Sequence, residues 1–258
     1  MIETVIFDWA GTTVDYECFA PVQAFIKTFK NEGIEVSYEE VRQPMGALKR
    51  DHIKILLEMP RIRTLFETVH HRPFSEEDID DMLAIFTKKL MAEISDHTIL
   101  KPDVLETVAY LRDKQIKIGT TTGYTAEMFA PVALAAKAQG YEPDVLMTPD
   151  DVQGRGRPAP DMIDKNLERL AIQNRQAVIK VGDTVSDILE GKNANVLSVG
   201  VIEGSSIMGL TASEYAQLSA EQRQSEINRM RQVFETAGAD ATILNLGELP
   251  RLIEKVTQ

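Results

Sequence analysis

Short apolar runs that end in Asp, Thr or Gly recur along the chain. They occupy residues 4–7, 116–122, 145–147, 177–181, 196–201 and 241–244. Short, continuously apolar runs are typical of strands buried on both faces of a parallel sheet. Helical patterns lie between them, at residues 103–112, 126–138, 160–170 and 187–194. Strands that alternate with helices predict a doubly wound, Rossmann-like α/β sheet, which forms its sites at the carboxyl ends of the strands.

One long segment breaks this alternation directly after the first strand. Its helical patterns cover residues 21–31, 38–42, 47–58, 62–70 and 76–94, with Pro44, Pro60 and Pro73 between them. Proline is a frequent boundary between helices. We therefore expect a helical cap domain over residues 16–99, inserted into a core domain formed by residues 1–15 and 100–258. A second, polar and helix-rich excursion spans residues 205–238.

Charge and composition narrow the possible partners. The 28 Lys and Arg against 40 Asp and Glu give a net charge of −12. That balance argues against general nucleic-acid binding, which needs a clustered basic surface. No stretch approaches 18 consecutive apolar residues, so we expect no membrane span. The single cysteine, Cys18, excludes an intramolecular disulfide and a Cys-rich zinc site. Because the first residues also lack a signal-peptide pattern, we expect a cytoplasmic protein.

Three polar clusters follow predicted strands. They are Asp8-Trp-Ala-Gly-Thr-Thr13, Thr120-Thr-Thr-Gly-Tyr124 and Gly182-Asp-Thr-Val-Ser-Asp187. Each alone is consistent with an ordinary turn or a helix N-cap. Together they end strands of one predicted sheet, so their carboxylates and hydroxyls are expected to face one crevice.

In this order the clusters resemble the haloacid dehalogenase superfamily of phosphotransferases. The resemblance implies Asp8 as a nucleophile, Thr122 as a hydroxyl donor and Arg157 as the basic residue. Lys180 is a weaker basic candidate, because it lies inside a buried run and is expected to point along it. The resemblance also implies one Mg²⁺ per subunit, a cation that takes hard oxygen ligands. Its expected ligands are Asp8, Asp183 and the Ala10 backbone carbonyl, with Asp187 behind them.

Ala10 is a departure from most phosphatases of that superfamily. They carry an acid two residues after the nucleophile, which protonates the leaving alkoxide. Loss of such an acid costs on the order of 10²–10⁴ in rate. The chain is therefore either a poor phosphatase or acts on a leaving group that is not an alkoxide.

The predicted cap contains Met45-Gly-Ala-Leu-Lys-Arg-Asp-His52, which resembles the phosphonoacetaldehyde hydrolase family. Residues 7–15, 119–125, 148–152, 180–187 and 204–206 resemble the same family. The resemblance implies that Lys49 forms a Schiff base with an aldehyde substrate, a phosphonate, and that the protein is a homodimer contacting through its caps. The imine would take up the electrons of a breaking C–P bond.

The other cap residues have ordinary interpretations as well. His52, one helical turn after Lys49, is either a solvated helix residue or a group that handles protons. Met45 is either a core side chain or an apolar wall against the amine, while Cys18, Gly123 and Tyr124 are candidates to line the site. We expect the cap to open and close, with Gly11, Thr12 and Thr13 absorbing the motion.

Two other functions remain open from the residues. One is a Mg²⁺-dependent phosphatase of a small phosphate ester, against which Ala10 and Lys49 argue. The other is a phosphate-binding regulatory module without turnover, which has no use for Lys49 or a large cap.

Overall fold

The structure, a computed structural model, describes residues 1–257 and is built on a six-stranded parallel sheet. The strand order is β3-β2-β1-β4-β5-β6. The strands are β1 (Thr4–Phe7), β2 (Lys117–Thr121), β3 (Val145–Met147), β4 (Val178–Gly182), β5 (Leu197–Val201) and β6 (Ala241–Ile243). The doubly wound α/β class predicted from the apolar runs is confirmed.

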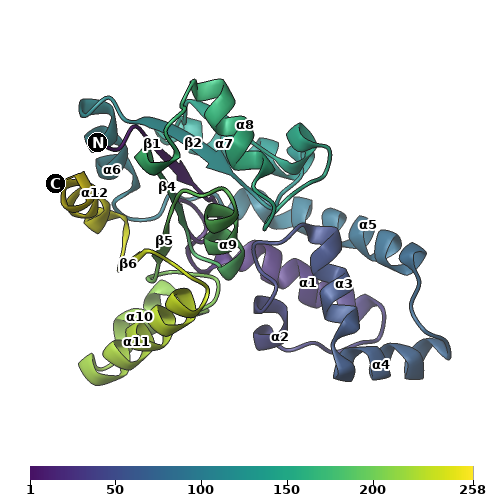
Figure 1. Cartoon of the computed structure of the whole chain (residues 1–258). Coiled ribbons are helices and arrows are strands. Elements are labelled where there is room, and N and C mark those ends of the chain that lie inside the picture. Colours follow the sequence, from purple (N-terminus) through teal and green to yellow (C-terminus); the bar gives the residue numbers. More distant parts are fainter. Residues whose placement is uncertain (258) are drawn as a thin grey trace.

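Helices cover both faces of this sheet (Figure 1). Val5 and Phe7 of β1 pack into one apolar cluster with α6 (Val104–Asp113), α7 (Ala126–Ala138) and α12 (Leu249–Thr257). Ile6 points to the opposite face and packs against α8 (Asp161–Leu170), and α9 (Val185–Asn193) covers β4 and β5. Every residue of β1 is buried, which explains why the strand is continuously apolar.

A helical insertion follows β1 and lies beside the sheet (Figure 1). It contains α1 (Phe19–Asn31), α2 (Tyr38–Arg42), α3 (Lys49–Glu58), α4 (Pro60–His70) and α5 (Glu76–Glu93). Ser37 and Ser75 cap α2 and α5 through their hydroxyls, each with an acidic partner three residues on. The ring centroids of Phe25 on α1 and Phe86 on α5 lie 4.2 Å apart, so aromatic side chains pack between these two helices inside the insertion.

The two chain segments that join this insertion to the sheet run side by side. Val14 pairs with Leu100 in an antiparallel bridge, and the Asp15 amide donates to the Ile99 carbonyl at 3.2 Å. Asp15 also accepts from the first backbone amides of α1, those of Phe19 and Ala20. These contacts tie the entry and the exit of the insertion to one another.

The residues expected to act as a hinge, 11–13, make several close contacts in the structure. Thr12 and Thr13 are buried and hydrogen-bonded, the first to the Asp183 carboxylate and the second to the Asp8 carbonyl. A Cβ at Gly11 would lie 2.3 Å from an Asp183 oxygen, so this glycine permits a close approach. Left-handed backbone occurs just beyond, at Asp15 and Cys18.

The polar excursion before β6 forms α10 (Ala212–Gln217) and α11 (Ala220–Thr236). Met230 and Phe234 bury the inner side of α11 against α9 and β6. A Cβ at Gly200 would lie 2.6 Å from the Phe234 ring, so β5 carries glycine where α11 approaches. The short 3₁₀ segments are η1 (Tyr16–Cys18), η2 (Ile94–His97), η3 (Pro149–Val152), η4 (Arg175–Ala177) and η5 (Leu246–Glu248).

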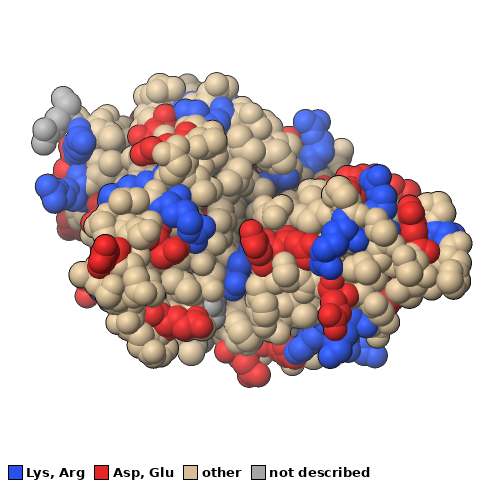
Figure 2. Space-filling view, turned by 90° about the horizontal axis from the view of Figure 1, so that it is seen from below, with Lys and Arg blue, Asp and Glu red and all other residues tan. Residues whose placement is uncertain are grey.

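Acidic and basic side chains are interspersed on the face that Figure 2 shows, without one continuous basic area. Within residues 1–257, no helix has both the length and the apolar character needed to cross a membrane.

Candidate active site

Asp8 lies at the carboxyl end of β1. This is the topological switch point of the sheet, because β2 and β3 lie on one side of β1 and β4 to β6 on the other. Phe7, the residue before it, pairs with Thr120 of β2 on one side and Val181 of β4 on the other. The Asp8 amide continues this ladder by donating to the Val181 carbonyl at 2.9 Å. Such a division point opens a crevice beyond the strand ends. The polar residues after β1, β2 and β4 therefore meet there.

The Asp8 carboxylate is buried against a guanidinium. Arg157 Nη1 lies 2.6 Å from Asp8 Oδ1. Burial and the nearby charge of Asp187 raise the pKa of Asp8 to about 7, although Arg157 opposes that rise. The site therefore holds more negative charge than its cations balance.

Asp183 is the second buried carboxylate, and polar groups from two loops hold it. Thr12 donates to Asp183 Oδ1 at 2.8 Å. The amide and the hydroxyl of Ser206 both donate to Asp183 Oδ2, at 2.8 and 2.7 Å. Burial and the Asp187 charge nevertheless raise the pKa of Asp183. These contacts fix the orientation of the carboxylate without neutralising it.

Asp187 is fully buried, and two cations balance its charge. One of its oxygens accepts from the Thr184 hydroxyl at 2.6 Å and from the Thr184 amide at 3.2 Å, and the second contact is part of the capping box of α9. The other lies 2.9 Å from both Arg157 and Lys180. Burial favours a higher pKa, but these two cations outweigh it and hold the pKa of Asp187 below its ordinary value.

Lys180 extends to groups on β2 and α9. Its Nζ donates to Thr121 at 2.9 Å and lies 3.3 Å from Glu190. Glu190 also accepts from Arg157 Nε at 3.0 Å. Lys180 therefore shares Asp187 and Glu190 as partners with Arg157. Arg157 is the cation that reaches Asp8.

The donor set at the strand ends fits a divalent cation. Asp8, Asp183 and Asp187 each offer an oxygen, and these oxygens lie within 4.8 Å of one another. Carboxylates are hard ligands of the type that Mg²⁺ prefers. Two of the three carboxyls, Asp8 and Asp183, have raised pKa values, because burial and then the repulsion between the carboxylate charges disfavour their ionised forms. A cation placed among them would relieve that repulsion.

Lys49 approaches this crevice from the helical insertion. It is the first residue of α3 and is only 5% exposed. Its Nζ lies 5.1 Å from the Tyr124 ring centroid and 5.8 Å from that of Phe25. Burial lowers the pKa of Lys49, and the Arg157 charge adds to this effect. The positive end of the α3 dipole also disfavours an ammonium there.

One small cavity joins these groups. It measures about 20 Å³, room for about one water molecule. Most of the residues predicted for the site line it: Asp8, Ala10, Cys18, Met45, Lys49, Thr122, Gly123, Tyr124 and Arg157. The insertion closes over it at glycines, since a Cβ at Gly123 would lie 2.9 Å from the Ala47 carbonyl. Gly46 similarly allows its loop to approach Thr184.

His52 lies behind Lys49 and is fully buried. Its ring stacks on Phe25 with centroids 3.8 Å apart, and its Nε2 lies 2.9 Å from the Val41 carbonyl. Burial and the Lys49 charge lower the pKa of His52 well below its ordinary value. Because a carbonyl only accepts, the neutral ring carries its proton on Nε2 and presents Nδ1 as a base.

Several supporting residues escaped the sequence interpretation. Thr12 belonged to the first polar cluster but was expected only as a hinge residue, and Glu190 had no pattern of its own. Each acts through a contact more than 30 positions away in the chain. Ser206 belonged to a segment that resembles the family, yet its contact with Asp183 depends on how the loop after β5 folds.

Comparison with known proteins agrees with this arrangement. A family model for haloacid dehalogenase-like hydrolases matches residues 2–195. The chain is 48% identical, over 99% of its length and 97% of the other, to the phosphonoacetaldehyde hydrolase of Parabacteroides distasonis. It is 47% identical to that of Lysinibacillus sphaericus, over 100% and 96% of the two chains.

A solved structure extends the similarity to three dimensions. The phosphonoacetaldehyde hydrolase-like protein from Oleispira antarctica superimposes with a TM-score of 0.96 at 37% identity, covering 99% of this chain and 92% of that one. Sequence and fold therefore agree over nearly the whole length, and the chain belongs to the phosphonoacetaldehyde hydrolase family of the haloacid dehalogenase-like hydrolases.

Proposed function

We propose that this protein hydrolyses the C–P bond of phosphonoacetaldehyde, releasing acetaldehyde and phosphate. The observation that carries the proposal is that Lys49 and Asp8, an amine and a carboxylate, line one small buried cavity together with Arg157. The full-length relatives that bear this activity in their names support it.

Lys49 provides the electron sink. Its neutral amine condenses with the substrate aldehyde, releases water and leaves a protonated imine. When the C–P bond breaks, its electron pair moves toward the imine nitrogen and an enamine forms. Without this step the leaving group would be an unstabilised carbanion. Burial of Lys49 raises the fraction of neutral amine, which the condensation requires.

Asp8 is the nucleophile that takes the phosphoryl group. An Asp8 oxygen attacks phosphorus as the enamine departs, so a P–O bond forms while the C–P bond breaks. Arg157, 2.6 Å from that carboxylate, stabilises charge on the transferring oxygens. The Thr122 hydroxyl and the Gly123 amide supply further donors beside the cavity. Water then cleaves phospho-Asp8 to phosphate and restores the carboxylate.

His52 is the proposed proton carrier for the cap lysine. Its neutral ring carries an unpaired Nδ1 one helical turn from Lys49. That nitrogen can accept a proton during imine formation and return it when the enamine is protonated. Hydrolysis of the resulting imine frees acetaldehyde and Lys49. Met45, Cys18 and Tyr124 line the cavity beside the Lys49 amine and shield it from water. Burial raises the pKa of Cys18, so its thiol stays protonated.

We propose Asp8, Asp183 and the Ala10 carbonyl as the groups that would hold one Mg²⁺, with Asp187 behind them. The bound ion would offset the negative charge of the phosphonate and of the carboxylates. Asp183, oriented by Thr12 and Ser206, supplies a ligand that the reaction leaves unchanged.

Residues 16–99 are proposed to act as a movable cap on a core of residues 1–15 and 100–258. A cavity of about 20 Å³ does not hold phosphonoacetaldehyde, so the substrate must enter while this region is displaced. Renewed contact with Gly123 would then exclude water and return Lys49 to Asp8. We further propose a cytoplasmic location and a homodimer formed through the caps.

A test must separate C–P cleavage from phosphate-ester hydrolysis. Purified protein with Mg²⁺ and phosphonoacetaldehyde should release acetaldehyde and phosphate in equal amounts. Simple phosphate esters should turn over far more slowly, since Ala10 cannot protonate an alkoxide. Comparable ester turnover, or phosphate without acetaldehyde, would instead favour the phosphatase assignment.

A further inference from the structure

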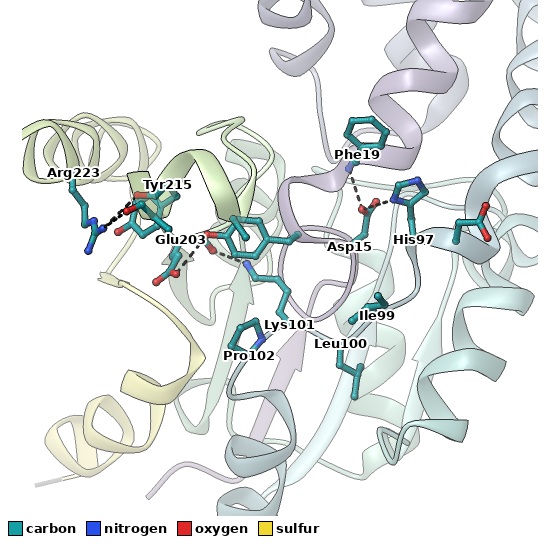
Figure 3. A pocket seen from close by; sticks show the side chains of 14 residues that line it. Asp15, Phe19, His97, Ile99, Leu100, Lys101, Pro102, Glu203, Tyr215 and Arg223 are labelled. Carbon is teal, nitrogen blue, oxygen red and sulfur yellow. Dashed lines mark hydrogen bonds and ion pairs between the residues drawn. The ribbon is translucent and has the colours of Figure 1, made fainter. Parts of the chain in front are cut away.

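Lys101 is a buried cation that the proposed reaction does not use. It is 8% exposed and lies on the segment that returns from the helical insertion to the sheet. Its Nζ donates to the Gly11 carbonyl at 2.5 Å and to the Glu203 carbonyl at 2.6 Å. Figure 3 shows the Lys101 side chain reaching toward Glu203. Lys101 therefore joins a loop after β1 to a loop after β5.

Both loops hold the same carboxylate. Gly11 packs so closely on Asp183 that a Cβ there would lie 2.3 Å from its Oδ2. The Glu203 loop continues to Ser206, whose amide and hydroxyl donate to that same oxygen. The ammonium of Lys101 thus fixes the separation of the two loops that enclose Asp183.

Lys101 also contacts the chain segment that enters the helical insertion. Its backbone amide donates to the Thr13 carbonyl at 2.8 Å. Its Nζ lies 5.3 Å from the ring centroid of Tyr16, on the entering segment. A Cβ at Gly204 would lie 2.7 Å from that ring, so the loop that leads to Ser206 also contacts Tyr16.

An open space borders these segments. A cavity of about 810 Å³ lies beside them, and its lining includes Tyr16, Lys101 and Glu203. Burying an ammonium against neutral carbonyls is costly. Burial lowers the pKa of Lys101 to about 8, although the charges of Asp183 and Glu203 oppose the shift. Because burial of the Lys101 ammonium is costly, we look for a role of its two carbonyl contacts.

We propose that Lys101 is a positioning residue, whose two carbonyl contacts hold the Gly11 and Glu203 loops so that Asp183 is oriented to bind a divalent cation. The inference rests on the metal site of the proposed function. It adds Lys101, a residue outside the catalytic cavity, to the groups that hold this site in place. Residues that orient metal ligands typically change metal affinity 10–100-fold when they are replaced.

The test is a calorimetric titration of the metal-free protein with Mg²⁺, which requires no turnover. Lys101→Met keeps the apolar stem and removes both donors, and we expect it to bind Mg²⁺ about 10–100-fold more weakly than the wild type. The matched control is Lys117→Met. Lys117 also donates to a backbone carbonyl, that of Leu170, but at the opposite end of the sheet. Its affinity for Mg²⁺ should equal that of the wild type.

The outcomes distinguish this inference from the proposed function. Wild-type protein that binds no Mg²⁺ would overturn the metal site and this inference together. Equal Mg²⁺ affinity of the wild type and Lys101→Met would overturn the role of Lys101 alone. If Lys101→Met does not fold, Lys101→Gln carries the test, because its neutral amide is too short to reach both carbonyls. Unchanged Mg²⁺ affinity in that variant would equally overturn the proposal.

Discussion

Arg157 Nη1 lies 2.6 Å from Asp8 Oδ1, while its Nε lies 3.0 Å from Glu190 on the other side. A planar guanidinium makes both contacts at once, and Glu190 prevents it from turning away from Asp8. The side chain is thereby fixed in advance at the place where charge develops on the phosphoryl oxygens. A single ammonium cannot reproduce this geometry.

Arg157→Lys should therefore lower kcat for phosphate release by about 10²-fold or more, the usual effect of removing one stabilising donor. The control is Arg155→Lys, two positions earlier, where the side chain is exposed and pairs with Asp161 at 2.9 Å. That variant should retain wild-type kinetics. Near-wild-type kcat in Arg157→Lys would show that another cation stabilises the reaction.

The metal-free protein should lose stability as the pH rises from about 4 to 7. Asp8 has a pKa of about 7 in the fold against 3.8 as a model value, so folding favours its protonated form. Such a group contributes stability below its unfolded pKa and loses that contribution as pH passes through the folded pKa. Asp8→Asn imitates the protonated state and should be less sensitive to pH.

Thermal unfolding in a chelator measures this effect. The Tm of Asp8→Asn should exceed that of the wild type at pH 8, with the difference shrinking toward pH 5. Each kcal/mol corresponds to roughly 2–4 °C in a chain of this size. Parallel pH curves for the two proteins would contradict the raised pKa.

Asp183→Asn should increase the Mg²⁺ concentration needed for half-maximal activity, because an amide keeps the shape but not the charge of the ligand. Its neighbours Thr12 and Ser206 would still hold the side chain. Asp240→Asn is the control, since Asp240 pairs with Lys192 on the surface. An unchanged Mg²⁺ requirement in Asp183→Asn would remove this residue from the metal site.

Gly123→Ala should impair closure over the site. The new methyl group would lie 2.9 Å from the Ala47 carbonyl, a backbone atom that cannot move by itself. We expect a lower kcat/KM with little change in Tm, because the clash exists only when the insertion contacts the sheet. Gly247→Ala, which meets atoms of Asn245 and Asp103 at 3.3 Å, is the control. Equal kcat/KM for both variants would argue against closure.

The strands and the site carboxylates could be predicted because local sequence determines them. Continuous apolar runs predicted all six strands, and polar residues after these runs predicted Asp8 and Asp183. The position of Lys180 could not be predicted, since the direction of a buried side chain depends on partners supplied by other elements. Here those partners are Asp187 and Glu190, both on α9.

The hinge expected at residues 11–13 stays a prediction, and the contacts of these residues count against it. Gly11, Thr12 and Thr13 have the composition of a flexible turn, but their contacts with Asp183 and with the Asp8 carbonyl hold them in place. Composition reports what a backbone can adopt, and only the fold shows what restrains it. The support that Lys101 gives from a distant segment is likewise visible only in three dimensions.

The central claim is that Lys49 forms an imine with the substrate above Asp8. Its direct test is borohydride reduction in the presence of phosphonoacetaldehyde, followed by mass mapping of the modified peptide. We expect irreversible inactivation of the wild type, with the label on Lys49, and no labelling of Lys49→Arg, which should still bind Mg²⁺. Full activity of the wild type after this treatment, or a label on Lys54 or Lys180 instead, would contradict the account.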